Sequence, residues 1–247
     1  MILTSCPWDG FRDSTISFCE ETVCGLVRSP ANAWSNMAYG AVAVWLLVAT
    51  RRQGTSPFAW VAGAVGLCSF LFHASATFLF QLFDYASMFL FTGLLIVLNV
   101  ERLRPLWRRH RAPGCAAIVA ISSAPVALGG QSGRVVFALH VALVIATEWR
   151  CARRAAGAID HRPYALMLAM FAVAYVFWAI DALRVECHPG DHLFQGHAIW
   201  HVLSAACFLA AHWFYAQFPS FARPARAGAS AGDLCQSNLA PAGEQRQ

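Results

Sequence analysis

Residues Gly196-His197-Ala198-Ile199-Trp200-His201 place two histidines four positions apart at the start of an apolar run that extends to Phe218. On an α-helix, positions i and i+4 share one face, with Cβ atoms about 5–6 Å apart, so both imidazoles can bind one metal ion. The spacing also fits two helix histidines that are hydrogen-bonded to neighbours. Within a membrane helix, however, ionisable residues are rare and usually functional.

The composition is that of a membrane protein. Of the 247 residues, 58% are hydrophobic and 13% are charged, about half of the usual ~25%. All 18 cationic residues are arginine. These arginines flank the apolar runs and are not interleaved with aromatic residues, so we expect no nucleic-acid partner.

Seven apolar segments approach the ~20 residues that a membrane-spanning helix needs. They cover residues 34–50, 58–77, 79–100, 114–128, 135–149, 164–183 and 197–218. We therefore predict an all-α bundle of seven transmembrane helices within residues 1–221, with a short polar segment before the first helix. Residues 222–247 are rich in Ala, Gly, Pro and Gln without apolar periodicity, which predicts a disordered cytoplasmic tail.

Arginine placement predicts the orientation. Fourteen arginines fall in the loops after the first, third and fifth segments and in the tail, whereas Arg12, Arg28, Arg134 and Arg184 fall on the other side. The amino terminus is therefore expected outside and the carboxyl terminus in the cytoplasm. We expect an integral protein of a bacterial inner membrane.

This topology brings several polar residues to one depth near the outer face. His73 lies near the outer end of the second segment, and Ser69 lies one turn before it. Asp84 lies near the outer start of the third segment, and His197 and His201 lie in the first turns of the seventh. A catalytic zinc ion usually takes three protein ligands and a water molecule, so we predict zinc on His73, His197 and His201.

The surrounding side chains suit hydrolysis. Zinc lowers the pKa of a bound water from 15.7 to about 7. Asp84 can accept a proton and return it to a leaving group, and Ser69 can donate to an oxyanion. Each also has a structural explanation, since Ser69 can bond to a helix carbonyl and Asp84 can pair with Gln81 or Tyr85.

Other ionisable residues are given structural roles or none. Arg184 follows Asp181 by three positions, which suggests an ion pair. His140 lies within the fifth segment without an evident role. Three further histidines are expected at surfaces or interfaces: His188, His192 and His212.

Four motifs stand in order across residues 19–201. Cys19-Glu20-Glu21 precedes the first helix, and Pro30-Ala31-Asn32-Ala33-Trp34-Ser35-Asn36 enters it. Ser69-Phe70-Leu71-Phe72-His73 is followed by Asp84, and the histidine pair comes last. Together they resemble the alkaline ceramidase family, within the wider CREST group of seven-helix membrane hydrolases.

The resemblance implies a zinc-dependent hydrolase that cleaves the amide bond of ceramide-like lipids to a sphingoid base and a fatty acid. It implies the three histidines as ligands, Asp84 as acid and base, and Ser69 near the oxyanion. Two alternatives remain, a receptor or scaffold with a structural zinc and a lipid-remodelling esterase. An unpaired acid beside an open coordination position favours the enzyme. The substrate partner is a membrane lipid, and the oligomeric state is left open.

Animal members of that family bind calcium through an acidic motif before the first helix. Glu20 matches this motif, so it is the candidate for weak calcium binding. Ser17, Thr22 and Ser29 depart from the motif, which argues against calcium.

Cysteine placement predicts a disulfide between Cys19 and Cys187, since both lie on the predicted outer side, where oxidising compartments permit bridges. Cys6 and Cys24 compete for either partner. The remaining cysteines are expected to be reduced: Cys68, Cys115, Cys151, Cys207 and Cys235.

Overall fold

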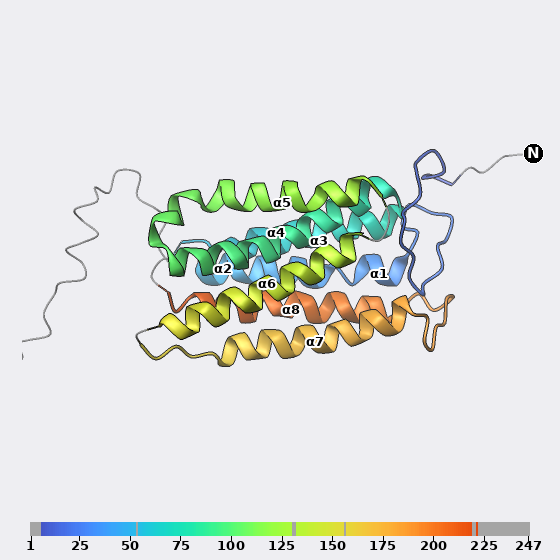
Figure 1. Cartoon of the computed structure of the whole chain (residues 1–247). Helices are drawn as coiled ribbons and strands as arrows, with labels where there is room; N and C mark the ends of the chain where they lie inside the picture. The colour runs from blue at the N-terminus through green and yellow to red at the C-terminus, as the bar shows by residue number, and fades with distance from the viewer. Residues whose placement is uncertain (1–5, 53, 130–131, 156, 219–220, 222–247) are drawn as a thin grey trace, which may run out of the picture.

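The computed structural model describes residues 6–52, 54–129, 132–155, 157–218 and 221. This part of the chain forms a bundle of long helices (Figure 1), with one isolated β-bridge between Asp13 and Thr77. The prediction of an all-helical bundle is therefore confirmed. The predicted tail at residues 222–247 lies outside the described residues.

Six helical segments in the described ranges are long and apolar enough to cross a membrane. They are α1 (Pro30–Trp34) continued by α2 (Met37–Thr50), α3 (Pro57–Ser75), α4 (Phe78–Leu103), α6 (Ser132–Arg154), α7 (Arg162–Ala182) and α8 (Gly196–Tyr215). The 3₁₀ helix η1 (Pro105–His110) leads into α5 (Arg111–Ala127), whose 17 residues correspond to the predicted fourth segment. A helix of that length spans about 25 Å, less than a hydrocarbon core of about 30 Å.

Two helices differ in extent from the predicted segments. Helix α6 continues beyond predicted residues 135–149 at both ends and includes Arg134, Arg153 and Arg154. The apolar run ends at these arginines. The main-chain hydrogen bonds of the helix continue past them, because long arginine side chains can reach the polar interface. The predicted first segment is divided at Ser35 and Asn36, where α1 ends and α2 begins.

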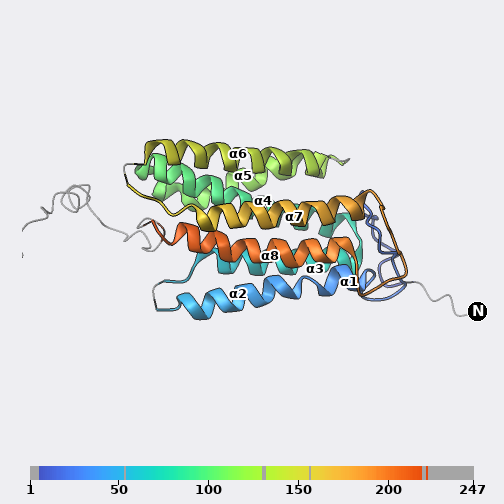
Figure 2. The ribbon, with the colours of Figure 1, turned by 90° about the horizontal axis from the view of Figure 1, so that it is seen from below.

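The two ends of the bundle differ. Residues 6–29 and the loop at residues 183–195 cover one end, which we call the disulfide end (Figures 1 and 2). The connections from α2 to α3, from α4 to α5 and from α6 to α7 lie at the opposite, arginine-rich end. Helix α3 finishes at the disulfide end, where Ala76 adopts φ +52° and its N–H bonds to the Phe72 carbonyl. Helix α8 begins at that same end.

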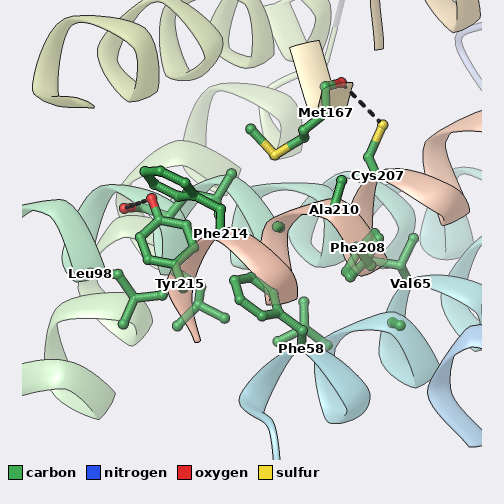
Figure 3. Packing of buried hydrophobic residues seen from close by; sticks show 14 of the residues in the cluster. Phe58, Val65, Leu98, Met167, Cys207, Phe208, Ala210, Phe214 and Tyr215 are labelled. Atoms are coloured by element: carbon green, nitrogen blue, oxygen red, sulfur yellow. Dashed lines mark hydrogen bonds between the residues drawn. The ribbon is translucent and has the colours of Figure 1, made fainter. Parts of the chain in front are cut away.

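Buried side chains fix the position of α8 (Figure 3). The rings of Phe208 and Phe91 stack at 4.0 Å, and Tyr215 packs against Phe58 with ring centres 5.8 Å apart. The Cys207 thiol donates to a main-chain carbonyl of α7 at 3.5 Å. Lipid tails are as apolar as these residues, so close packing and hydrogen bonds hold the helices together. This core orients the first two turns of α8 toward α3.

Ion pairs join the helices at the arginine-rich end. Arg102 pairs with Glu148 of α6, and Arg111 forms two hydrogen bonds to Glu101, at 2.8 and 2.7 Å. Glu101 and Glu148 are buried. Pairing offsets the cost of removing such charges from water, so these contacts stabilise the junction of α4 with α5 and α6.

Candidate metal centre

Three buried histidines meet near the disulfide end of the bundle. His73 lies in the last turn of α3, and His197 and His201 lie in the first two turns of α8. One ring nitrogen from each lies within 4.8 Å of the others. The Nε2 atoms of His73 and His197 are 3.2 Å apart. The sequence therefore identified three residues that the fold brings together.

The geometry of this group fits a metal ion. Three nitrogens bound tetrahedrally to one zinc ion at about 2.1 Å lie about 3.4 Å apart, close to the observed 3.2 Å. The Ser35 hydroxyl donates to the Asn32 carbonyl at 2.9 Å and lies 2.8 Å from Nδ1 of His201. It therefore accepts the Nδ1 proton, which leaves the Nε2 lone pair of His201 directed at the group. The break between α1 and α2 supplies this contact.

Asp181 positions α8 and the amino-terminal segment together. Its carboxylate accepts the main-chain N–H of His197 at 3.0 Å and that of Cys19 at 2.8 Å. The predicted ion pair of Asp181 with Arg184 is wrong, because both carboxylate oxygens are used by main-chain donors. Among the described ion pairs, none includes Arg184. The sixteen-residue separation of Asp181 from His197 has no helical periodicity, so the sequence carried no signal for this contact.

Gly196 permits α7 and α8 to approach each other beside the histidines. A Cβ atom at this position would lie 2.8 Å from the Phe177 carbonyl oxygen and 3.1 Å from Cβ of Asp181. Real Cβ atoms do not approach a main-chain oxygen so closely. A glycine here therefore lets the Asp181 carboxylate reach the first turn of α8.

Phe18 covers the histidine group, and the sequence analysis missed it. Its ring stacks on His197 with centres 3.7 Å apart and lies 5.5 Å from the ring of His73. A single aromatic residue in a polar segment has no pattern that would have indicated this role. The position of Phe18 depends on the contacts of the next two residues, Cys19 and Glu20.

Two disulfides tie down this amino-terminal segment. One joins Cys19 to Cys187 and the other joins Cys6 to Cys24. Cys68, Cys115, Cys151 and Cys207 are free thiols, and Cys235 lies outside the described residues. The bridge from Cys19 crosses to the loop before α8, next to Phe18.

Glu20 binds main-chain donors of α1. Its carboxylate accepts the N–H groups of Ala31 and Asn32 at 2.8 and 2.9 Å, and it lies 2.9 Å from Nδ1 of His192. The carboxylate is buried, and its two oxygens face these nitrogen atoms. A calcium ion would have to displace these contacts, so the geometry favours a helix cap at Glu20.

Ser69 and Asp84 lie beside the histidines. The Ser69 hydroxyl is 3.4 Å from Nε2 of His201, and it also interacts with the Asp84 carboxylate. Gln81, one of the partners considered for Asp84, instead forms hydrogen bonds with Thr15 at 2.7 and 2.8 Å. The carboxylate of Asp84 thus faces the histidine side of α4.

A cavity of about 340 Å³ adjoins this site. Its wall includes Asp84, Ser69, His197 and His201. The rest is mostly aliphatic and aromatic, with side chains from α4, α6, α7 and α8 that include Leu95, Val144, Ile145, Met167, Leu168 and Phe208. Such a cavity suits a hydrocarbon chain whose polar end lies at the histidines.

Two of the remaining histidines, His140 and His212, make contacts between helices. His140 bridges two helices, with Thr92 Oγ1 at 2.7 Å from one ring nitrogen and Ser122 Oγ at 2.8 Å from the other. His212 bonds to Ser56 at 3.1 Å. These residues hold helices together away from the three-histidine group.

One comparison with known proteins identifies a family. A family model described as Ceramidase matches residues 10–224, which is most of the chain and includes every residue of the site. No curated protein matches the sequence.

Proposed function

The chain belongs to the ceramidase family, as its motifs indicated, and we propose that it is a zinc-dependent membrane hydrolase of ceramide-like N-acyl lipids. The reaction cleaves the amide bond and releases a sphingoid base and a fatty acid. Family membership supports ceramide hydrolysis within a membrane. The observation that carries the finer proposal is the three-histidine group with Asp84 beside a largely apolar cavity.

The proposed ligands are Nε2 atoms of His73, His197 and His201. Zinc at this position supplies Lewis acidity, which activates water at neutral pH and polarises a carbonyl. Asp84 accepts the proton of the attacking water and returns it to the leaving nitrogen. Ser69 donates its hydroxyl proton to the oxygen that gains negative charge. Phe18 excludes water from the disulfide-end side of the site.

The substrate enters from the bilayer between α6 and α7. Ile145 of α6 and Tyr175 of α7 both line the cavity, yet they remain 43% and 51% exposed on the lipid-facing surface of the bundle. An apolar chain can therefore slide into the cavity without crossing water. This route suits a lipid that never leaves the membrane.

The proposed orientation places the disulfide end outside the cell. Disulfides persist in oxidising compartments, and arginines concentrate on the cytoplasmic side of membrane proteins. The two disulfides and the arginine-rich connections lie at opposite ends of the bundle. We place the protein in a bacterial inner membrane with the site toward the periplasm, and we treat residues 1–221 as the catalytic domain with residues 222–247 as a cytoplasmic tail.

Metal analysis and a substrate panel test the proposal together. Purified protein should hold about one zinc ion per chain and should hydrolyse N-acyl lipids, with loss of activity on chelation and recovery on adding zinc. Full zinc without turnover of any N-acyl lipid would instead indicate a receptor or scaffold. Cleavage of ester-linked lipids with no cleavage of amides would indicate a lipid-remodelling esterase.

A further inference from the structure

The cavity contains one charge that the proposed reaction does not use. The described residues that line the cavity include one arginine, Arg134 of α6, and one carboxylate, Asp84. Asp84 interacts with Ser69 and belongs to the chemistry above. A cation at the edge of an apolar, membrane-embedded cavity is costly unless polar groups or an anion surround it. Arg134 is half-buried at the cavity wall, so a ligand in the cavity can reach its guanidinium group.

The protein partners of Arg134 are uncharged. No carboxylate of the described chain lies within 4.0 Å of its side-chain nitrogens. Its guanidinium carbon lies 5.2 Å from the centre of the Trp178 ring, and the guanidinium group interacts with the Tyr85 side chain. A guanidinium group carries five N–H donors in a planar fork, so donors remain to face the cavity.

The position of Arg134 within α6 makes its surroundings more positive. It is the third residue of the helix, and the first turn of α6 contains no acidic residue. A helix amino terminus carries a partial positive charge, at which acidic side chains are normally favoured. An arginine in this turn adds to that charge and creates a field that an anion would balance.

Gly133 fixes the neighbour of Arg134. A Cβ atom at position 133 would lie 2.5 Å from Cζ of Tyr85. The tyrosine ring therefore rests directly on the α6 backbone, which holds its hydroxyl beside the guanidinium group. Trp178 of α7 packs against the guanidinium group. Tyr85 and Trp178 both line the cavity, so they hold the guanidinium group of Arg134 at the cavity wall.

We propose that Arg134 binds an anionic oxygen group of the lipid, namely a phosphate, sulfonate or carboxylate. Arg134 and His197 line the same cavity, whose other lining residues are mostly apolar. An anion bound to the guanidinium group would therefore share this cavity with the reacting amide. It comes from a charged head group of the substrate or from the carboxylate of the released fatty acid. This inference rests on the proposed function.

Substrate discrimination tests the inference in wild-type protein, Arg134→Gln and Arg134→Lys. The first comparison measures kcat/KM for two N-acyl lipids with the same chains, one with an anionic and one with a neutral head group. The second measures inhibition by a free fatty acid and by the matching fatty alcohol. Arg134→Gln should lower the preference for the anion about 10- to 100-fold, because charge-assisted hydrogen bonds are lost. Arg134→Lys should retain part of it, since the charge remains but the fork is lost.

Arg12→Gln is the matched control. Arg12 lies at the same end of the bundle and stacks over Phe78 at 4.0 Å, but it does not line the cavity. Arg12→Gln should change neither the ratio of kcat/KM for the anionic and neutral lipids nor the ratio of inhibition by the fatty acid and the fatty alcohol. In Arg134→Gln, a lower head-group ratio assigns the anion to the substrate, and a lower fatty-acid ratio alone assigns it to the product. If both ratios equal those of the wild type, the inference is wrong.

A binding measurement separates this inference from the proposed function. The rise in Tm on adding the anionic lipid, relative to the neutral lipid or the fatty alcohol, is measured in Asp84→Asn protein with and without Arg134→Gln. An anion-dependent rise that disappears with Arg134→Gln supports the binding site even if the wild-type protein hydrolyses no lipid. If the anion-dependent rise in Tm is the same with and without Arg134→Gln, the inference is wrong even if the wild-type enzyme is active.

Discussion

Replacing Asp181 by asparagine should weaken zinc binding, although none of the three ligand side chains is changed. In the structure the carboxylate accepts two main-chain N–H groups, from His197 at 3.0 Å and from Cys19 at 2.8 Å. The residue is 3% exposed, so water does not replace a lost partner. An asparagine can still accept one N–H through its oxygen, but its NH₂ group then opposes the second donor.

The expected magnitude follows from these contacts. Losing one hydrogen bond to a charged group costs about 1.5–3 kcal/mol, and the negative charge at the start of α8 is lost as well. About 1.4 kcal/mol corresponds to a factor of ten in a binding constant. If this free energy is lost from zinc binding through His197, zinc affinity should fall roughly 10- to 100-fold. Residues that support metal ligands in other proteins have effects of this size. The same loss of stability should lower Tm by roughly 3–10 °C.

Zinc competition with a chelator and thermal unfolding in detergent measure the two effects. Asp191→Asn is the control, because Asp191 also accepts main-chain N–H groups, from Leu193 and Phe194 at 2.9 Å, but in the exposed loop before α8. Hydrogen bonds from Phe194 and then Leu193 lower the pKa of its carboxyl group, and an asparagine oxygen can accept the same bonds. If Asp181→Asn binds zinc and unfolds like the wild type, Asp181 does not support the site.

Four further predictions concern the site and the disulfide beside it. His201→Ala protein should purify without stoichiometric zinc, measured by elemental analysis, and full retention of the metal would remove this ligand from the set. Asp84→Asn should keep zinc but lose about 10²- to 10⁴-fold in amide hydrolysis, because the proton acceptor is gone; unchanged activity would remove Asp84 from the mechanism. Ser69→Ala should lose less than Asp84→Asn, since zinc also polarises the carbonyl. Cys19 and Cys187 should resist thiol reagents until a reductant is added, and reaction of both in native, unreduced protein would contradict the bridge.

The sequence could place the histidines because helices have a fixed period. His197 and His201 share a face by their spacing alone, and hydropathy was enough to bring His73 to the same depth. The turn that directs Ser35 to His201 was not predictable in this way, since it lies where one apolar run is divided into α1 and α2. Residues outside the helices, such as Phe18 and Glu20, follow no period and depend on contacts that form only when the chain is folded.

Those non-periodic residues explain how the site is held in one arrangement. Phe18 stacks on His197, and the next residue, Cys19, is joined to the loop before α8 and donates to Asp181. Glu20 then caps α1, the helix that ends at the Ser35 contact with His201. Three consecutive residues of the polar segment thereby connect α1, α7 and α8. In a membrane, where apolar packing alone gives little preference for one helix rotation over another, these polar and covalent contacts select the rotation that points both α8 histidines at His73.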